Sequence, residues 1–60
     1  MKIKALTSDG TWWRLSLKAN ASKEKFVRDW NRSNDSDLFF TTGDEIALQK
    51  RNIVAIMFEE

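Results

Sequence analysis

The stretch that decides the fold is KIKALTSDGTWWRLSLK, residues 2–18. Apolar and polar residues alternate on both sides of Asp9-Gly10, which is the period of a half-buried strand. An Asp-Gly pair between two such segments favours a tight turn. The stretch therefore predicts a β-hairpin, with the adjacent residues Trp12 and Trp13 in its second strand, residues 11–18.

Burial selects the register of this hairpin. A two-residue loop would pair Lys4 with Leu15 and so place a lysine in the core. A three-residue loop, Ser8-Asp9-Gly10, pairs Ala5 with Trp13 instead, and all the aliphatic side chains then share one face. We therefore expect the three-residue loop, with its glycine in the left-handed conformation of a turn with a bulge.

This register gives the two tryptophans different environments, because successive side chains on a strand point to opposite faces. Trp13 is expected in the core, together with Ile3, Ala5, Leu15, Leu17, Phe26 and Trp30. Trp12 is expected on the opposite face, together with Lys2, Lys4, Leu6, Arg14 and Lys18. An outward tryptophan in so small a chain indicates a candidate binding surface.

One helix is predicted after the hairpin. Ser22 is a favourable N-cap for a helix over residues 23–33. Phe26, Val27 and Trp30 are expected to share the apolar face of this helix. The following residues, 31–37, are rich in Asn, Ser and Asp and predict a loop.

Three further strands are predicted in the second half of the chain. They cover residues 38–41, 45–50, with Ile46 and Leu48 inward, and 53–58. The last segment is an unbroken apolar run and is expected to be a central strand covered on both faces. The expected fold is α+β, a small antiparallel sheet of about five strands (β-β-α-β-β-β) with one helix packed on one face, curled toward a partial barrel.

The size of the chain predicts self-association. Sixty residues form a single small domain, residues 1–60, with a limited core. One helix covers two or three strands of one sheet face, so apolar surface remains to be hidden by curling of the sheet or by another copy. Cysteine is absent, which excludes a disulfide. We therefore expect a homo-oligomer, in the first instance a dimer.

Catalysis is not expected. The chain contains neither histidine nor cysteine, the usual acid–base and nucleophilic groups near neutral pH. Their absence also removes the common ligands of zinc, iron and copper. A calcium loop starting at Asp35 fails, because Phe39 and Phe40 occupy its fifth and sixth positions. We expect no catalytic residues, no metal and no cofactor.

Two binding functions remain open. The first is a protein-interaction module or regulator that uses an uncovered sheet face or edge, with the candidate residues Trp12, Leu6, Phe39 and Met57. The alternative is single-stranded nucleic-acid binding, with phosphates held by charge and a base stacked on an aromatic ring. Its candidate residues are Lys2, Lys4, Trp12, Arg14 and Lys18.

Charge is unevenly distributed along the sequence. Residues 1–32 carry eight basic and three acidic side chains, and residues 33–60 carry two basic and six acidic ones. A basic first half is compatible with a nucleic-acid surface. Lysines on a strand also protect against aggregation, and the isoelectric point of about 8.1 is below that of strongly basic binding domains.

A cytoplasmic protein that does not enter a membrane is the expectation. No apolar run approaches the roughly 20 residues of a membrane span, and residues 1–6 alternate, unlike a signal-peptide core. The layout is similar to that of many small bacterial and phage proteins, a likeness of size and order that implies no function.

Overall fold

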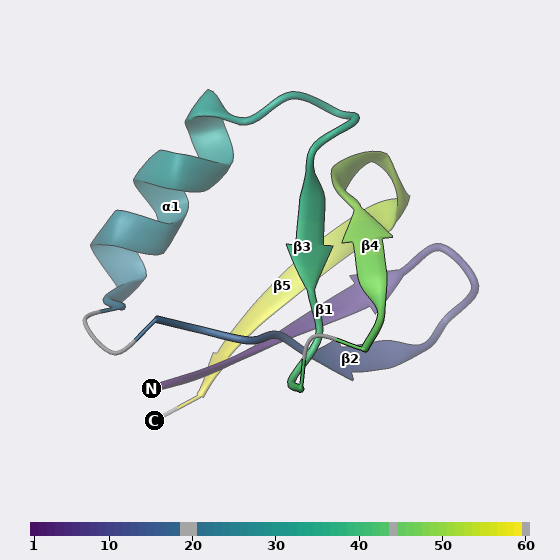
Figure 1. The fold of residues 1–60 in the computed structure, drawn as a ribbon, viewed down its shortest axis with the longest axis horizontal. Coiled ribbons are helices and arrows are strands. Elements are labelled where there is room, and N and C mark those ends of the chain that lie inside the picture. The colour runs from purple at the N-terminus through teal and green to yellow at the C-terminus, as the bar shows by residue number, and fades with distance from the viewer. Residues whose placement is uncertain (19–20, 44, 60) are drawn as a thin grey trace.

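The computed structural model describes residues 1–18, 21–43 and 45–59. The order of its elements is the predicted one, strand, strand, helix, strand, strand, strand (Figure 1). The elements are β1 (Lys2–Thr7), β2 (Trp12–Arg14), α1 (Lys23–Arg32), β3 (Leu38–Phe40), β4 (Ala47–Gln49), a short 3-10 helix η1 (Lys50–Asn52) and β5 (Ile53–Glu59).

The predicted register of the first hairpin is confirmed. Ala5 lies opposite Trp13 in the antiparallel pair β1–β2. The loop between the strands has three residues, because the Thr7 amide donates to the Thr11 carbonyl at 2.9 Å. Gly10 has φ of 89°, a left-handed conformation that glycine adopts without steric cost.

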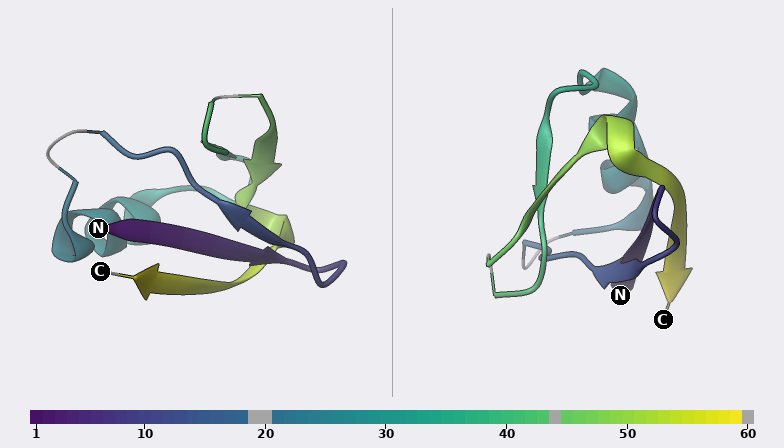
Figure 2. Two further views of the ribbon diagram at one scale, coloured as in Figure 1. Left: turned by 90° about the horizontal axis from the view of Figure 1, so that it is seen from below. Right: turned by 90° about the vertical axis from the view of Figure 1, so that its right-hand side faces the viewer.

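The expected α+β class, with five antiparallel strands and one helix, is confirmed, but the strands form two sheets. One sheet has the order β2-β1-β5 and the other pairs β3 with β4. Within residues 1–18, 21–43 and 45–59, one isolated bridge, Leu15 to Thr41, links them. It is flanked by the hydrogen bonds Ser16 N to Phe40 O and Thr42 N to Arg14 O, both 2.9 Å. The β3–β4 pair stands over the larger sheet (Figure 2), and the described residues form no closed barrel.

The position expected for the apolar run 53–58 is wrong. Within the described residues, β5 is an edge strand, and β1 is the central one. Val54 is 61% exposed and Met57 45%. The central place is taken by β1, which pairs on both sides although its lysines project from one face toward solvent. A strand can therefore be central without being covered on both faces, when one face of its sheet is uncovered.

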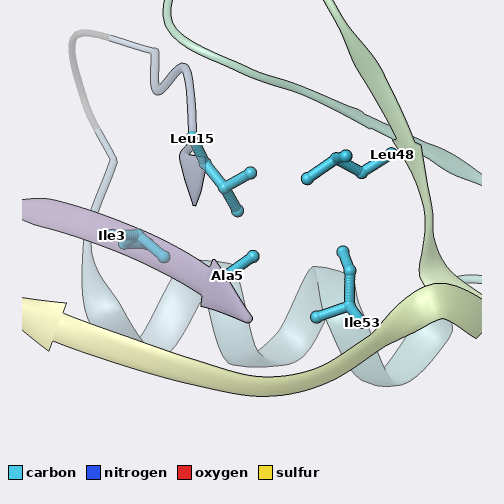
Figure 3. Packing of buried hydrophobic residues seen from close by; sticks show 5 residues of the cluster. All are labelled: Ile3, Ala5, Leu15, Leu48 and Ile53. Carbon is cyan, nitrogen blue, oxygen red and sulfur yellow. The ribbon is translucent and has the colours of Figure 1, made fainter. Parts of the chain in front are cut away.

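The core lies between the two sheets. Its buried apolar residues converge from β1, the end of β2, β4 and the start of β5 (Figure 3), and they are Ile3, Ala5, Leu15, Leu48 and Ile53. Half-buried side chains pack around this cluster, including the predicted Trp13, Leu17, Phe26 and Trp30. Ile46, which was expected to point inward, is 42% exposed because it precedes β4 and the inward position of that strand is occupied by Leu48.

Both ends of α1 are capped, and at the C-terminal end the Ser33 amide donates to the Trp30 carbonyl at 3.2 Å. The Ser22 hydroxyl accepts a hydrogen bond from the Lys25 amide at 3.2 Å, as expected for an N-cap. Phe26 and Trp30 stack with centroids 6.2 Å apart and face the core. Val27 was expected on the same face, but it is 40% exposed, since its position on the helix turns it away from the sheets.

Candidate partner-binding surface

The sheet β2-β1-β5 has one face turned away from the core, and we call it the outer face. The pairing of the three strands defines its members, because residues directly opposite each other share a face. Leu6 lies between Trp12 and Ala55, Lys4 lies between Arg14 and Met57, and Lys2 lies opposite Glu59. The outer face thus consists of Lys2, Lys4, Leu6, Trp12, Arg14, Ala55, Met57 and Glu59.

Three of the four residues predicted to bind a partner meet on the outer face. Trp12 is 43% exposed and Met57 45%, while Leu6 is half-buried between their two strands. The three-residue loop of the hairpin is what places Trp12 outward and beside Leu6. That these residues contact a partner stays a prediction.

Phe39, the fourth predicted residue, does not lie on the outer face. Its ring centroid is 5.1 Å from that of Trp30, and it packs against the core. The reason is its pairing with the buried Leu48, which fixes the inward face of β3. Its neighbours Leu38 and Phe40 are the exposed ones, at 51% and 47%. Alternation along the segment Leu38–Phe40 places Phe39 opposite its two neighbours, but only the pairing with Leu48 shows that Phe39 is the inward one.

The basic residues predicted for nucleic-acid binding are also divided. Lys2, Lys4 and Arg14 share the outer face with Trp12. The ammonium group of Lys4 lies 3.3 Å from a carboxylate oxygen of Glu59, which offsets part of its positive charge. Lys18 follows the end of β2 and lines a hollow of about 230 Å³ against α1, together with Lys25 and Phe26.

The carboxylate of Asp9 holds the hairpin loop together. The Thr7 hydroxyl donates to it, and so does the Thr11 amide at 3.1 Å. These two hydrogen bonds, that from Thr7 first, lower the pKa of Asp9 from its ordinary value of 3.8. The Trp13 indole donates in turn to the Thr7 hydroxyl at 3.1 Å. The Asp9 carboxylate, the Thr7 hydroxyl and the Trp13 indole thus bond to one another, and this network stabilises the hairpin turn.

Residues 1–18, 21–43 and 45–59 contain no group of three or more acidic side chains placed to hold a metal ion. None of their helices has the length and apolar character needed to cross a membrane. Comparison of the chain with protein families, with characterised proteins and with solved structures finds no match.

Proposed function

We propose that this chain is a non-enzymatic protein-interaction module that associates with a second copy of itself through the β2-β1-β5 sheet. One observation carries the proposal. Three large exposed apolar side chains, Trp12, Val54 and Met57, belong to this one sheet, while its other face packs on the core. Exposed apolar groups gathered on one small domain are typical of interaction sites.

A concentration series tests self-association. The mass of the chain, 7.0 kDa as a monomer, is measured by light scattering from micromolar to millimolar concentration. We expect a rise toward twice the monomer mass, and a shift of the midpoint to higher concentration in the Met57→Lys variant. Val27→Lys is the matched control, because Val27 is a similarly exposed apolar residue on α1. A monomer mass throughout, or equal effects of both variants, contradicts the proposal.

Binding of single-stranded nucleic acid is the second candidate. The observation in its favour is that Trp12 and Arg14 project from the same face of β2, with Lys4 beside Arg14. Such a face offers one stacking platform and charges for phosphates. It is the weaker candidate, because Glu59 lies on the same face and contacts Lys4, and because Lys18 lies outside it.

Titration with a fluorescent oligonucleotide at several salt concentrations tests this candidate. It requires an affinity that falls steeply with salt and is lost in Trp12→Ala and in Arg14→Glu. Arg28→Glu, on the exposed surface of α1, is the control for a general change of charge. Absence of salt-dependent binding, or equal losses in Arg14→Glu and Arg28→Glu, eliminates it.

A further inference from the structure

One long strand edge has no partner in the described part of the chain. β5 pairs with β1 on one side, and no described strand pairs with its other side. In the right-hand view of Figure 2 it forms the outer margin of the structure. The opposite edge of the sheet is occupied, because Arg14 and Ser16 exchange hydrogen bonds with residues 42 and 40. The unpaired backbone groups of β5 are therefore a template for another extended strand.

This edge carries little of the usual protection against pairing. Edge strands of soluble proteins commonly carry charges or proline, or are kept short. β5 has seven residues and no proline, and its one charged residue is Glu59 at the end of the strand. Its one irregularity is a bulge at the Ile53 end, where the pairing with β1 shifts. The regular part of the edge thus covers residues 55–59.

We infer that two copies of the chain pair antiparallel along β5, with Met57 on the two-fold axis. This inference rests on the self-association proposed above and specifies its geometry. When a strand pairs antiparallel with its own copy, residues opposite each other must face the same side of the sheet. The two-fold axis must therefore pass between one residue and the same residue of the second copy. Met57 is the centre of the regular segment 55–59. The three-stranded sheets of the two copies then form one continuous six-stranded sheet.

The side chains fit this register. Met57 meets its own copy on the outer face, and Ile56 lies opposite Phe58 of the second copy on the inner face, so both contacts are apolar. Glu59 lies opposite Ala55 of the second copy. The two Glu59 carboxylates are then four residues apart along the seam, about 13 Å, which is beyond the screening length of about 8 Å at physiological salt.

Packing of the two outer faces against each other is the alternative geometry, and charge opposes it. Lys4 and Arg14 occupy the middle of the outer face, so a face-to-face dimer would bring two basic clusters together with little water between them. Edge pairing leaves these residues in solvent. It also leaves Trp12 exposed, two strands away from the seam.

Single cysteines distinguish the two geometries, since the natural chain has none. At the two-fold axis the Cα atoms of position 57 would be about 4.5–5.5 Å apart, within the range of about 4.4–6.8 Å that a disulfide needs. Under mild oxidation we expect Met57→Cys to form a covalent dimer. Trp12→Cys and Val27→Cys, both exposed positions away from the seam, are expected to remain monomeric on a non-reducing gel.

A charge at the axis gives a second, independent measurement. Met57→Glu places a carboxylate beside Lys4 in its own chain, which favours the fold, but beside a second carboxylate in the dimer. We expect its dissociation constant, measured by light scattering, to rise about tenfold, and that of Trp12→Glu to stay unchanged.

These experiments distinguish a failure of the edge-paired geometry from a failure of self-association. Dimers that are disrupted by Trp12→Glu and cross-linked through Trp12→Cys, with no cross-link through Met57→Cys, overturn edge pairing and leave the proposed function intact. A natural chain that stays monomeric at millimolar concentration overturns both.

Discussion

The side chain of Lys50 binds the C-terminal end of α1 at Trp30. Its ammonium group donates to the Trp30 carbonyl at 2.8 Å and to the Ser33 carbonyl at 3.0 Å. The same group lies 4.9 Å from the centroid of the Trp30 ring. The Trp30 carbonyl also accepts the amide and the hydroxyl of the C-cap residue Ser33. A residue of η1 thus adds a donor to the capped end of the helix and holds α1 against the β3–β4 sheet.

Loss of this contact is expected to destabilise the fold. Lys50→Met keeps the length of the side chain but removes both hydrogen bonds and the charge over the ring. We expect the free energy of unfolding to fall by about 1–3 kcal/mol, measured by urea denaturation. Arg51→Met is the control, because the side chain of Arg51 is exposed. Equal losses in both variants contradict the role of Lys50.

Thr7 is expected to matter through its hydroxyl. Thr7 is buried at 7% exposure, and its hydroxyl joins the Trp13 indole to Asp9. Thr7→Val keeps the shape and leaves the indole N–H without its acceptor, which costs about 1–3 kcal/mol. In the Trp13→Phe background the same substitution should cost less, because no indole N–H remains. Equal costs in both backgrounds, read from thermal unfolding, show that this hydrogen bond is not what stabilises the loop.

Acid is expected to weaken the hairpin loop through Asp9. Because the pKa of Asp9 in the folded chain lies below its ordinary value of 3.8, the folded state favours the carboxylate. This contribution to stability is complete above pH 3.8 and is lost as the pH falls through the pKa of the folded state. The measurement is the stability difference between the natural chain and Asp9→Asn, followed from neutral pH to pH 2. A difference that grows on acidification contradicts the prediction.

Two adjacent phenylalanines are expected to respond differently to truncation. Phe39 contacts the rings of Phe26 and Trp30, so Phe39→Ala is expected to cost about 2–4 kcal/mol of unfolding free energy. Phe40 is 47% exposed, and Phe40→Ala is expected to cost less than about 1 kcal/mol. Similar values for the two variants would place both side chains in the core.

The local rules worked well where one physical requirement dominated. Burial of every aliphatic side chain selected the three-residue loop, and the N-cap preference of Ser22 located the start of α1. The same rules separated Trp12 from Trp13, so the main residue of the candidate surface was identified from the hairpin alone. These requirements concern residues close together in the chain.

The errors arose where distant segments decide the outcome. Hydrophobic residues at 53–58 and at 38–40 predict strands, but the strands that pair with them determine which side chains are covered. Phe39 is inward because it faces Leu48, and Met57 is exposed because β5 pairs on one side only.

The sequence by itself determined the type and order of the strands and of α1, the hairpin register and the different environments of Trp12 and Trp13, because alternation, turn chemistry and capping act over a few residues. Only the tertiary structure decided that β1 is central and β5 lies at an edge, since strand order depends on contacts between the two ends of the chain. That edge, with Met57 at the middle of its regular part, is the surface on which the proposed dimer depends.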